Sequence, residues 1–184
     1  MADFGRLTLR TGRLLLRPLR ETDAAAIFAI RSDPKVMRYT SSVPLVSLDQ
    51  AEAFIARETA GMANGESLRL GLQRIEDDAL IGTCILFHMN TQCRRAEVGY
   101  ELRHDAWGQG YMHEALHTFL HFGFTELALN RIEADIDPRN IASARSLERL
   151  GFAREGLLRE RWIVDGEVSD SALYGLLLSD WRAR

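Results

Sequence analysis

A pair of closely spaced glycines is the clearest candidate for binding chemistry in this sequence. Gly108 and Gly110 follow a strand-like run, 96–103, and lie at the start of a segment, 109–126, whose apolar residues recur at helical spacing. A glycine-rich turn can direct several backbone N–H groups to one point, and the first turn of the following helix adds partial positive charge there. The pattern therefore predicts a phosphate-binding loop.

The residues that follow the glycines exclude the two most common nucleotide loops. A Walker A loop requires Gly-Lys-Ser/Thr, whereas this chain has Gly110-Tyr111-Met112, and the dinucleotide fingerprint requires a third glycine where His113 stands. Because two glycines are a weak signal by themselves, a turn without any ligand is an equal alternative from the loop alone.

Two carboxylates on the preceding run could transfer protons. Glu97 and Glu101 lie four residues apart, so their side chains point to the same face of a strand. Either carboxylate could act as a general base. The alternative is a pair of ordinary exposed carboxylates on a half-solvated sheet.

Histidines and cysteines offer little evidence for a metal site. His113, His117 and His121 share one stripe of the predicted helix, but they spread along it and no cysteine is nearby, which suits a single ion poorly. We interpret them as a solvated polar face and expect no metal. Cys84 and Cys93 have neither zinc nor redox spacing, so we expect two free thiols.

Length and composition limit the classes of protein. The chain has 184 residues, 46% of them hydrophobic and 27% charged, and a formal net charge of −3. We expect one domain over residues 1–184. The negative charge argues against a nucleic-acid binder. The N-terminus lacks a signal-peptide core, and no run approaches the ~20 apolar residues of a membrane span, so we expect a cytoplasmic protein without a membrane partner.

The elements that must position these residues follow from hydrophobic periodicity. We predict strands at 7–18, 68–74, 80–89, 96–103, 131–137, 159–164 and 168–178, and helices at 22–31, 48–62, 109–126 and 140–150. Asp165-Gly166 separates the last two strands and is a strong hairpin signal. This order predicts an α+β or mixed α/β sheet rather than a doubly wound parallel fold.

Taken together, these segments resemble the GNAT acetyltransferases, especially their RimJ/RimL branch. The matching segments follow the family order along nearly the whole chain: Thr11 to Leu19, Asp23, Ser32-Asp33-Pro34, Ala96 to Leu102, Trp107 to Tyr111, Glu114-Ala115, Asn140, Ser143, Leu150-Gly151-Phe152 and Asp180-Trp181. The resemblance implies a GNAT-like fold, with about seven mostly antiparallel strands and helices on both faces.

The resemblance also implies a co-substrate, acetyl-CoA, and an acceptor, the primary amine of a protein N-terminus or a small molecule. In this family two neighbouring strands splay apart and CoA lies in the gap. The residues that would hold it are Tyr100, Glu101, Leu102, Trp107, Gly108, Gln109, Gly110, Tyr111, Met112, His113, Asn140, Ser143 and Arg145. Among these, 109–113 would bind the pyrophosphate and 100–102 the pantetheine arm.

The groups that transfer protons differ from the common family pattern. Many GNAT enzymes carry a tyrosine seven residues after the asparagine as general acid, and this chain has Leu147 there. Ser143 is the substitute expected in this branch, with Glu97 or Glu101 as base. A strand N–H near Leu102 would stabilise the developing oxyanion.

The acceptor pocket and the assembly are less specified. Arg38, Tyr39 and Thr40 are the predicted acceptor-lining residues, opposite the final hairpin. A homodimer is expected from the family. Two alternatives remain open: a non-catalytic acyl-CoA sensor, suggested by the bulky Met112 and the missing tyrosine, and a protein-interaction module without a CoA site.

Overall fold

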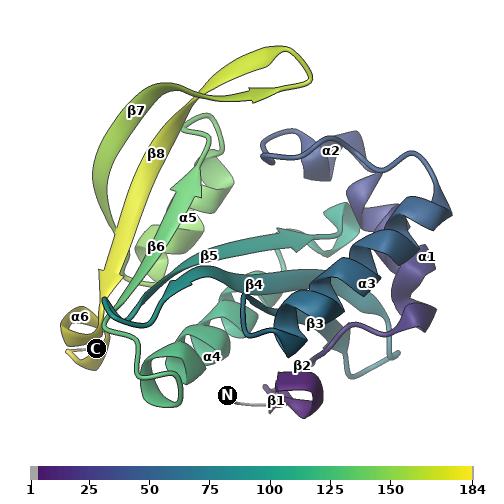
Figure 1. The fold of residues 1–184 in the computed structure, drawn as a ribbon, viewed down its shortest axis with the longest axis horizontal. Helices are drawn as coiled ribbons and strands as arrows, with labels where there is room; N and C mark the ends of the chain where they lie inside the picture. The colour runs from purple at the N-terminus through teal and green to yellow at the C-terminus, as the bar shows by residue number, and fades with distance from the viewer. Residues whose placement is uncertain (1–3, 184) are drawn as a thin grey trace.

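The sheet is the framework of the molecule. The computed structural model describes residues 4–183, and its eight strands form one twisted sheet (Figure 1). The strands are β1 (Leu9–Arg10), β2 (Leu14–Arg17), β3 (Leu68–Arg74), β4 (Leu80–Asn90), β5 (Arg95–Leu102), β6 (Arg131–Ile136), β7 (Ala153–Val164) and β8 (Glu167–Leu177). Their order is β1-β2-β3-β4-β5-β6-β8-β7, and only the β5–β6 pair is parallel. The predicted mixed, mostly antiparallel sheet is confirmed.

Two strand predictions were wrong in their bounds. The run 7–18 is two strands, because a turn at Thr11 folds Leu9 back against Leu16; this accounts for eight strands rather than about seven. The strand predicted at 159–164 already starts at Ala153. A bulge near Glu160, whose φ is 51°, breaks the alternation on which the prediction relied.

Helices cover both faces of the sheet. They are α1 (Ala24–Arg31), α2 (Pro34–Met37), α3 (Leu48–Ala63), α4 (Tyr111–Thr125), α5 (Ile141–Arg149) and α6 (Leu178–Arg182). The short helices α2 and α6 were not predicted. Helix α2 begins at a proline after Asp33, whose carboxylate accepts a hydrogen bond from the Lys35 N–H.

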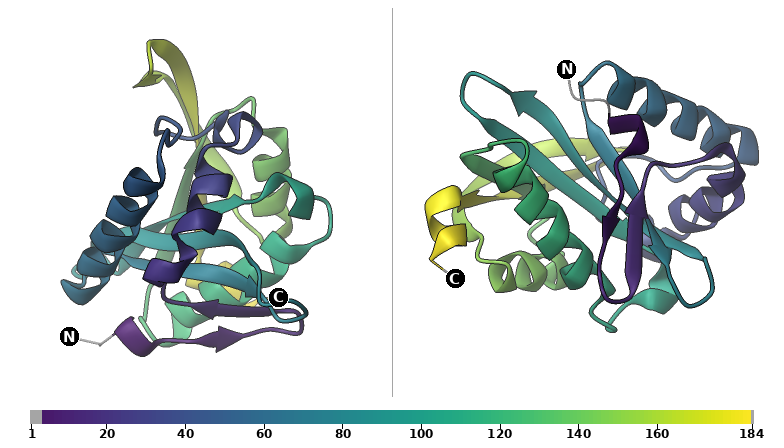
Figure 2. Two further views of the ribbon diagram at one scale, coloured as in Figure 1. Left: turned by 90° about the vertical axis from the view of Figure 1, so that its right-hand side faces the viewer. Right: turned by 90° about the horizontal axis from the view of Figure 1, so that it is seen from below.

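Two apolar cores join the layers. Helices α1 and α3 pack on one face of β3 and β4, where Ile27, Ala51 and Phe54 are buried. Helices α4 and α5 lie on the opposite face, as the two views of Figure 2 show, and the larger core includes Phe119 and Leu147. Within residues 4–183 no helix is both long and apolar enough to cross a bilayer.

Strands β5 and β6 part after a short paired stretch. They pair only from Arg95↔Arg131 to Glu97↔Glu133. Beyond that point β5 stays on β4 as far as Leu102, while β6 follows β8, and Figure 1 shows the two strands diverging. The Arg103 N–H donates to Ile81 O at 2.7 Å and therefore points toward β4. Because the direction of the N–H groups alternates along a strand, those of Tyr100 and Leu102 point away from β4 and into the gap.

Candidate active site

A cleft of about 1390 Å³ runs along the splayed strands and is lined by residues of α2 and of the β7–β8 hairpin. Figure 1 shows these two elements on either side of the splayed strands. Every residue predicted from the sequence to bind or react lines this cleft, except Gln109. Segments that are distant in the sequence therefore meet here: the α2 loop, β5, the loop before α4 and the start of α5.

The glycine-rich loop forms the start of α4. Gly108 and Gly110 have φ values of 74° and 80°, in the left-handed region that other residues adopt only with strain. Gly110 is the N-cap of α4, and the first N–H groups of a helix have no acceptor within it. Together with the helix dipole, this end of α4 suits an anionic phosphate at the edge of the cleft.

A clamp from the β1–β2 turn holds the loop, and sequence reasoning gave it no role. The Arg13 guanidinium donates to Gln109 O at 2.9 Å and to the Glu114 carboxylate at 2.7 Å. The Thr11 hydroxyl donates to the same carboxylate. Burial pushes the pKa of Glu114 up, but these hydrogen bonds outweigh burial and the pKa is lowered. Glu114 is thus held ionised between the turn and α4.

Trp107 closes one end of the strand gap. Its indole N–H donates to Leu102 O at 2.7 Å, although 45% of the residue is exposed. This bond occupies the carbonyl of Leu102 and leaves the N–H of Leu102 directed to the gap. The Gln109 side chain turns away to Asp105 O at 2.9 Å, which explains why it does not line the cleft.

Tyr100 and Ser143 form a hydroxyl pair beside the gap. The Tyr100 hydroxyl lies 2.7 Å from Ser143 Oγ. Burial raises the pKa of Tyr100 to about 12, although the Ser143 hydrogen bond opposes this, so the phenol stays protonated at neutral pH. Asn140 caps α5 by accepting from the Ser143 N–H at 3.1 Å, and this cap fixes Ser143 in the first turn.

Glu97 and Glu101 have different environments despite their shared strand face. Glu101 is only 8% exposed; its carboxylate accepts from Arg31 at 2.8 Å and from the Thr83 hydroxyl. The interpretation of Glu101 as an ordinary exposed carboxylate is therefore wrong, because it forms a buried ion pair between α1 and β5. Arg31 also lies 4.3 Å from the Phe54 ring centroid.

Glu97 is the carboxylate with the freer oxygens. Burial raises its pKa above the ordinary 4.5, although a hydrogen bond with His88 at 3.2 Å opposes the rise. Neighbouring Asp135 and Glu133 add to the increase by charge repulsion. A half-buried carboxylate with a raised pKa in a cleft is a typical proton acceptor.

The predicted acceptor residues follow α2. Arg38 and Arg139 lie 5.1 and 5.8 Å from the Tyr39 ring centroid, so the ring connects the α2 loop to the β6–α5 loop. The Thr40 hydroxyl is occupied by Met37 O at 2.9 Å. Arg145 lines the cleft on the α5 side, away from this group.

The histidines and cysteines of residues 4–183 do not form a cluster that could bind a metal in the cleft. Among residues 4–183 no group of three or more His, Cys, Asp or Glu side chains could hold a metal ion. His113, His117 and His121 are exposed on α4. Cys84 is buried in β4 and Cys93 is exposed, and both are free thiols.

A gap between parallel strands beside a positive helix end suits a long extended ligand with a pyrophosphate, which is the architecture of an acyl-CoA-dependent transferase. The acetyltransferase (GNAT) domain family matches residues 13–153, and the chain belongs to this family. It is 36% identical over 174 residues to the N-acetyltransferase p20 of Bacillus licheniformis, covering 95% of this chain and 98% of p20.

Two further relatives widen the comparison. The chain is 25% identical to a spermidine N(1)-acetyltransferase of Vibrio cholerae over 94% of its length and 97% of the relative. It also superposes on Mycobacterium smegmatis RimJ in complex with CoA-disulfide with a TM-score of 0.86 and 26% identity, covering 97% and 91% of the two chains. The chain is thus a RimJ/RimL-like, acetyl-CoA-dependent N-acetyltransferase that acetylates amines. Nothing in the comparisons supports the non-catalytic alternatives.

Proposed function

We propose that the acceptor amine reacts on the Glu97 side of β5, with the pantetheine arm lying in the β5–β6 gap. The observation that carries this proposal is the early end of the β5–β6 pairing, which leaves the backbone of Tyr100 and Leu102 directed into the cleft. An extended amide-containing chain can pair with such an edge as a strand would. The start of α4 lies at the same cleft, where a pyrophosphate fits.

The chain's own groups would then orient the reaction and move its protons. Acetyl-CoA supplies an activated acetyl group. The N–H group of Tyr100, which lies nearer to Glu97 than that of Leu102 does, stabilises negative charge on its carbonyl oxygen, and the N–H group of Leu102 is left to pair with the pantetheine arm. Glu97 takes a proton from the incoming ammonium group, and its raised pKa makes it a better base than an ordinary carboxylate. Attack by the neutral amine forms the C–N bond and breaks the C–S bond. The proton that the nitrogen then loses reaches the departing sulfur through the Ser143 hydroxyl, which the Tyr100 hydroxyl holds in place.

The acceptor class determines how much help Glu97 must give. An α-amine has a pKa of about 7.7–8.0 and is partly neutral at physiological pH, whereas a lysine-like amine has a pKa of about 10.4. The name of the Vibrio relative gives spermidine, a polyamine, as its substrate. The proposed acceptor is therefore either a protein N-terminus or a small-molecule amine. We also propose that residues 1–184 form a single domain, that the protein is a homodimer and that it lies in the cytoplasm.

An acetylation assay tests the proposal. Purified protein is mixed with acetyl-CoA and separate amines, and both thiol release and the mass of the acetylated product are measured. We expect product with at least one amine, and a Glu97→Gln variant with lower turnover but unchanged acetyl-CoA affinity. The matched control is Glu126→Gln, at the far end of α4. Equal turnover of Glu97→Gln and the unmodified enzyme would rule out Glu97 as the base.

A further inference from the structure

We propose that the acceptor carries an anionic group as well as its amine, and that Arg57 binds this group. The inference rests on the proposed function, because it takes the amine to lie at Glu97. It concerns the opposite wall of the same cleft, where Arg31, Arg57 and Arg69 surround the ring of Phe54. These three arginines are called the arginine cluster below.

The two walls of the cleft differ in charge. The lining contributed by residues 31–69 carries five basic side chains, Arg31, Lys35, Arg38, Arg57 and Arg69, and one carboxylate, Glu58. The lining contributed by β5 and β6 includes the carboxylates of Glu97, Glu101 and Asp135. An acceptor with a cationic amine at one end and an anion at the other would match both walls.

The arginine cluster is built around one aromatic ring. The guanidinium carbons of Arg31, Arg57 and Arg69 lie 4.3, 5.2 and 5.0 Å from the centroid of Phe54. Stacking on this ring holds three like charges close together. With the carboxylates of Glu101 and Glu58 beside it, the cluster keeps one net positive charge, which is available to an anion.

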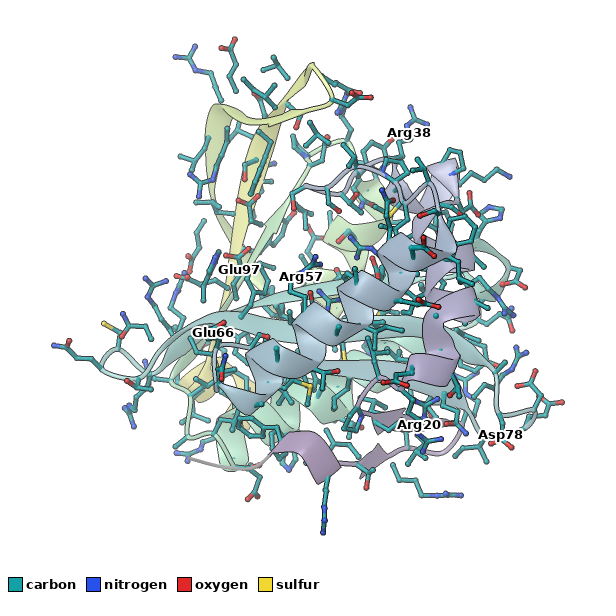
Figure 3. All side chains as sticks on the ribbon, turned by 45° about the vertical axis from the view of Figure 1, so that its right-hand side comes forward. Arg20, Arg38, Arg57, Glu66, Asp78 and Glu97 are labelled. Atoms are coloured by element: carbon teal, nitrogen blue, oxygen red, sulfur yellow. The ribbon has the colours of Figure 1, made fainter. Side chains whose placement is uncertain are left out.

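Within the cluster only Arg57 is available to a ligand. The side chains of Arg31 and Arg69 are 10% and 11% exposed and are committed to Glu101 and to Glu58, each at 2.8 Å. The Arg57 side chain is 67% exposed, and its contact is with its sequence neighbour Glu58 at 3.2 Å. Figure 3 shows Arg57 coming from α3 and Glu97 from the sheet. A ligand anion can thus displace a weak contact without breaking a buried ion pair.

The sheet register sets how far apart the two ligand groups must be. Arg69 is opposite Ile85 and Ile85 is opposite Gly99, which is two residues from Glu97. With a rise of about 3.3 Å per residue and about 4.8 Å between strands, the Cα atoms of Arg69 and Glu97 are about 12 Å apart. The side chains of Ile85 and Phe87 lie beside Gly99, so the floor between the two groups is apolar. Arg57 stacks on the same Phe54 ring as Arg69, so an anion at Arg57 and an amine at Glu97 are separated by several bonds, unlike those of an α-amino acid.

Matched acceptors test this inference. The probes are 6-aminohexanoate and its amide, and the peptide amides Ala-Ala-Asp and Ala-Ala-Asn, which distinguish a small molecule from a peptide as the source of the anion. We expect each acid to be acetylated with a kcat/KM about tenfold or more above its neutral partner, the size of one charge-assisted hydrogen bond. Arg57→Gln should bring the ratio near one through KM, whereas Arg10→Gln, on exposed β1, should preserve it.

A binding experiment tests this inference separately from the proposed function. Calorimetry with 6-acetamidohexanoate and CoA measures anion binding without any reaction. Binding of 6-acetamidohexanoate that is lost in Arg57→Gln would support the inference, even if no amine were acetylated. The absence of acetylation would contradict the proposed function alone. Equal binding of 6-acetamidohexanoate and its amide, or a preference for spermidine over the acids, would overturn the inference while leaving acetyl transfer intact.

Discussion

Deletion of the Ser143 hydroxyl is the sharpest test of the proton-donor assignment. Ser143 is 9% exposed, and its Oγ lies 2.7 Å from the Tyr100 hydroxyl. Ser143→Ala would leave that phenol without its partner, which costs about 1–3 kcal/mol of unfolding free energy. If Ser143 also protonates the departing sulfur, kcat should fall about 10²–10⁴-fold, the usual contribution of a general acid.

The assay must separate lost chemistry from lost structure. We would measure kcat from thiol release, the acetyl-CoA Kd by calorimetry and the melting temperature of the same preparations. The Asn140 cap uses the Ser143 backbone, not its hydroxyl, so α5 should stay in place and the Kd should change little. Ser146→Ala is the control, since its hydroxyl bonds to Ala142 O of its own helix.

Tyr100→Phe completes the test. The two hydroxyls act as one unit in this mechanism, so the double variant should be no slower than Ser143→Ala alone. An unchanged kcat for Ser143→Ala, with an unchanged Kd, would refute the assignment. Additive losses would mean that the two hydroxyls act independently.

Further predictions concern pH and the supports of the site. Turnover should fall as pH drops through the pKa of Glu97, which is raised above its ordinary 4.5. His88→Asn should move this fall in turnover to higher pH, because the hydrogen bond that opposes the rise in pKa is lost. Asparagine tolerates the φ of 49° at this position. A pH–rate profile that is identical in both proteins would contradict this. Glu114→Gln should weaken acetyl-CoA binding about tenfold, as the loop clamp loses charge-assisted bonds; an unchanged Kd in calorimetry would argue against the clamp. Asp23→Asn should cost about 3–5 kcal/mol in denaturant unfolding, because it leaves the buried Arg17 charge unpaired, and a loss under 1 kcal/mol would contradict this. Burial pushes the pKa of Asp23 up but hydrogen bonds from Arg17 and the Arg20 N–H lower it, so this stabilisation is present above pH 3.8 and is lost as pH falls through the lowered value.

Local signals in the sequence were enough for part of the site. The glycines at 108 and 110 and the cap at Asn140 are short-range features, so their conformations follow from neighbouring residues alone. The splay of β5 and β6, in contrast, was expected only from the family resemblance. Nothing in the residues of either strand marks the point where their pairing ends.

Contacts between distant residues could not be predicted. Glu101 and Arg31 are 70 positions apart, and a sequence pattern does not distinguish a buried ion pair from two solvated charges. The same holds for Tyr100 and Ser143, and for the clamp between Arg13 and Glu114. These contacts depend on how the sheet and helices pack, which hydrophobic periodicity does not specify.

The most direct test of the central claim is a calorimetric titration with acetyl-CoA of the unmodified protein, Gly110→Glu and Gly166→Glu. Both glycines have a φ of 80°, so both variants carry the same backbone strain, but Gly166 lies at the tip of the β7–β8 hairpin, away from the start of α4. We predict micromolar binding by the unmodified protein and by Gly166→Glu, and none by Gly110→Glu. Equal binding by all three would contradict the placement of the pyrophosphate at α4, and no binding by the unmodified protein would contradict the acetyl-CoA site as a whole.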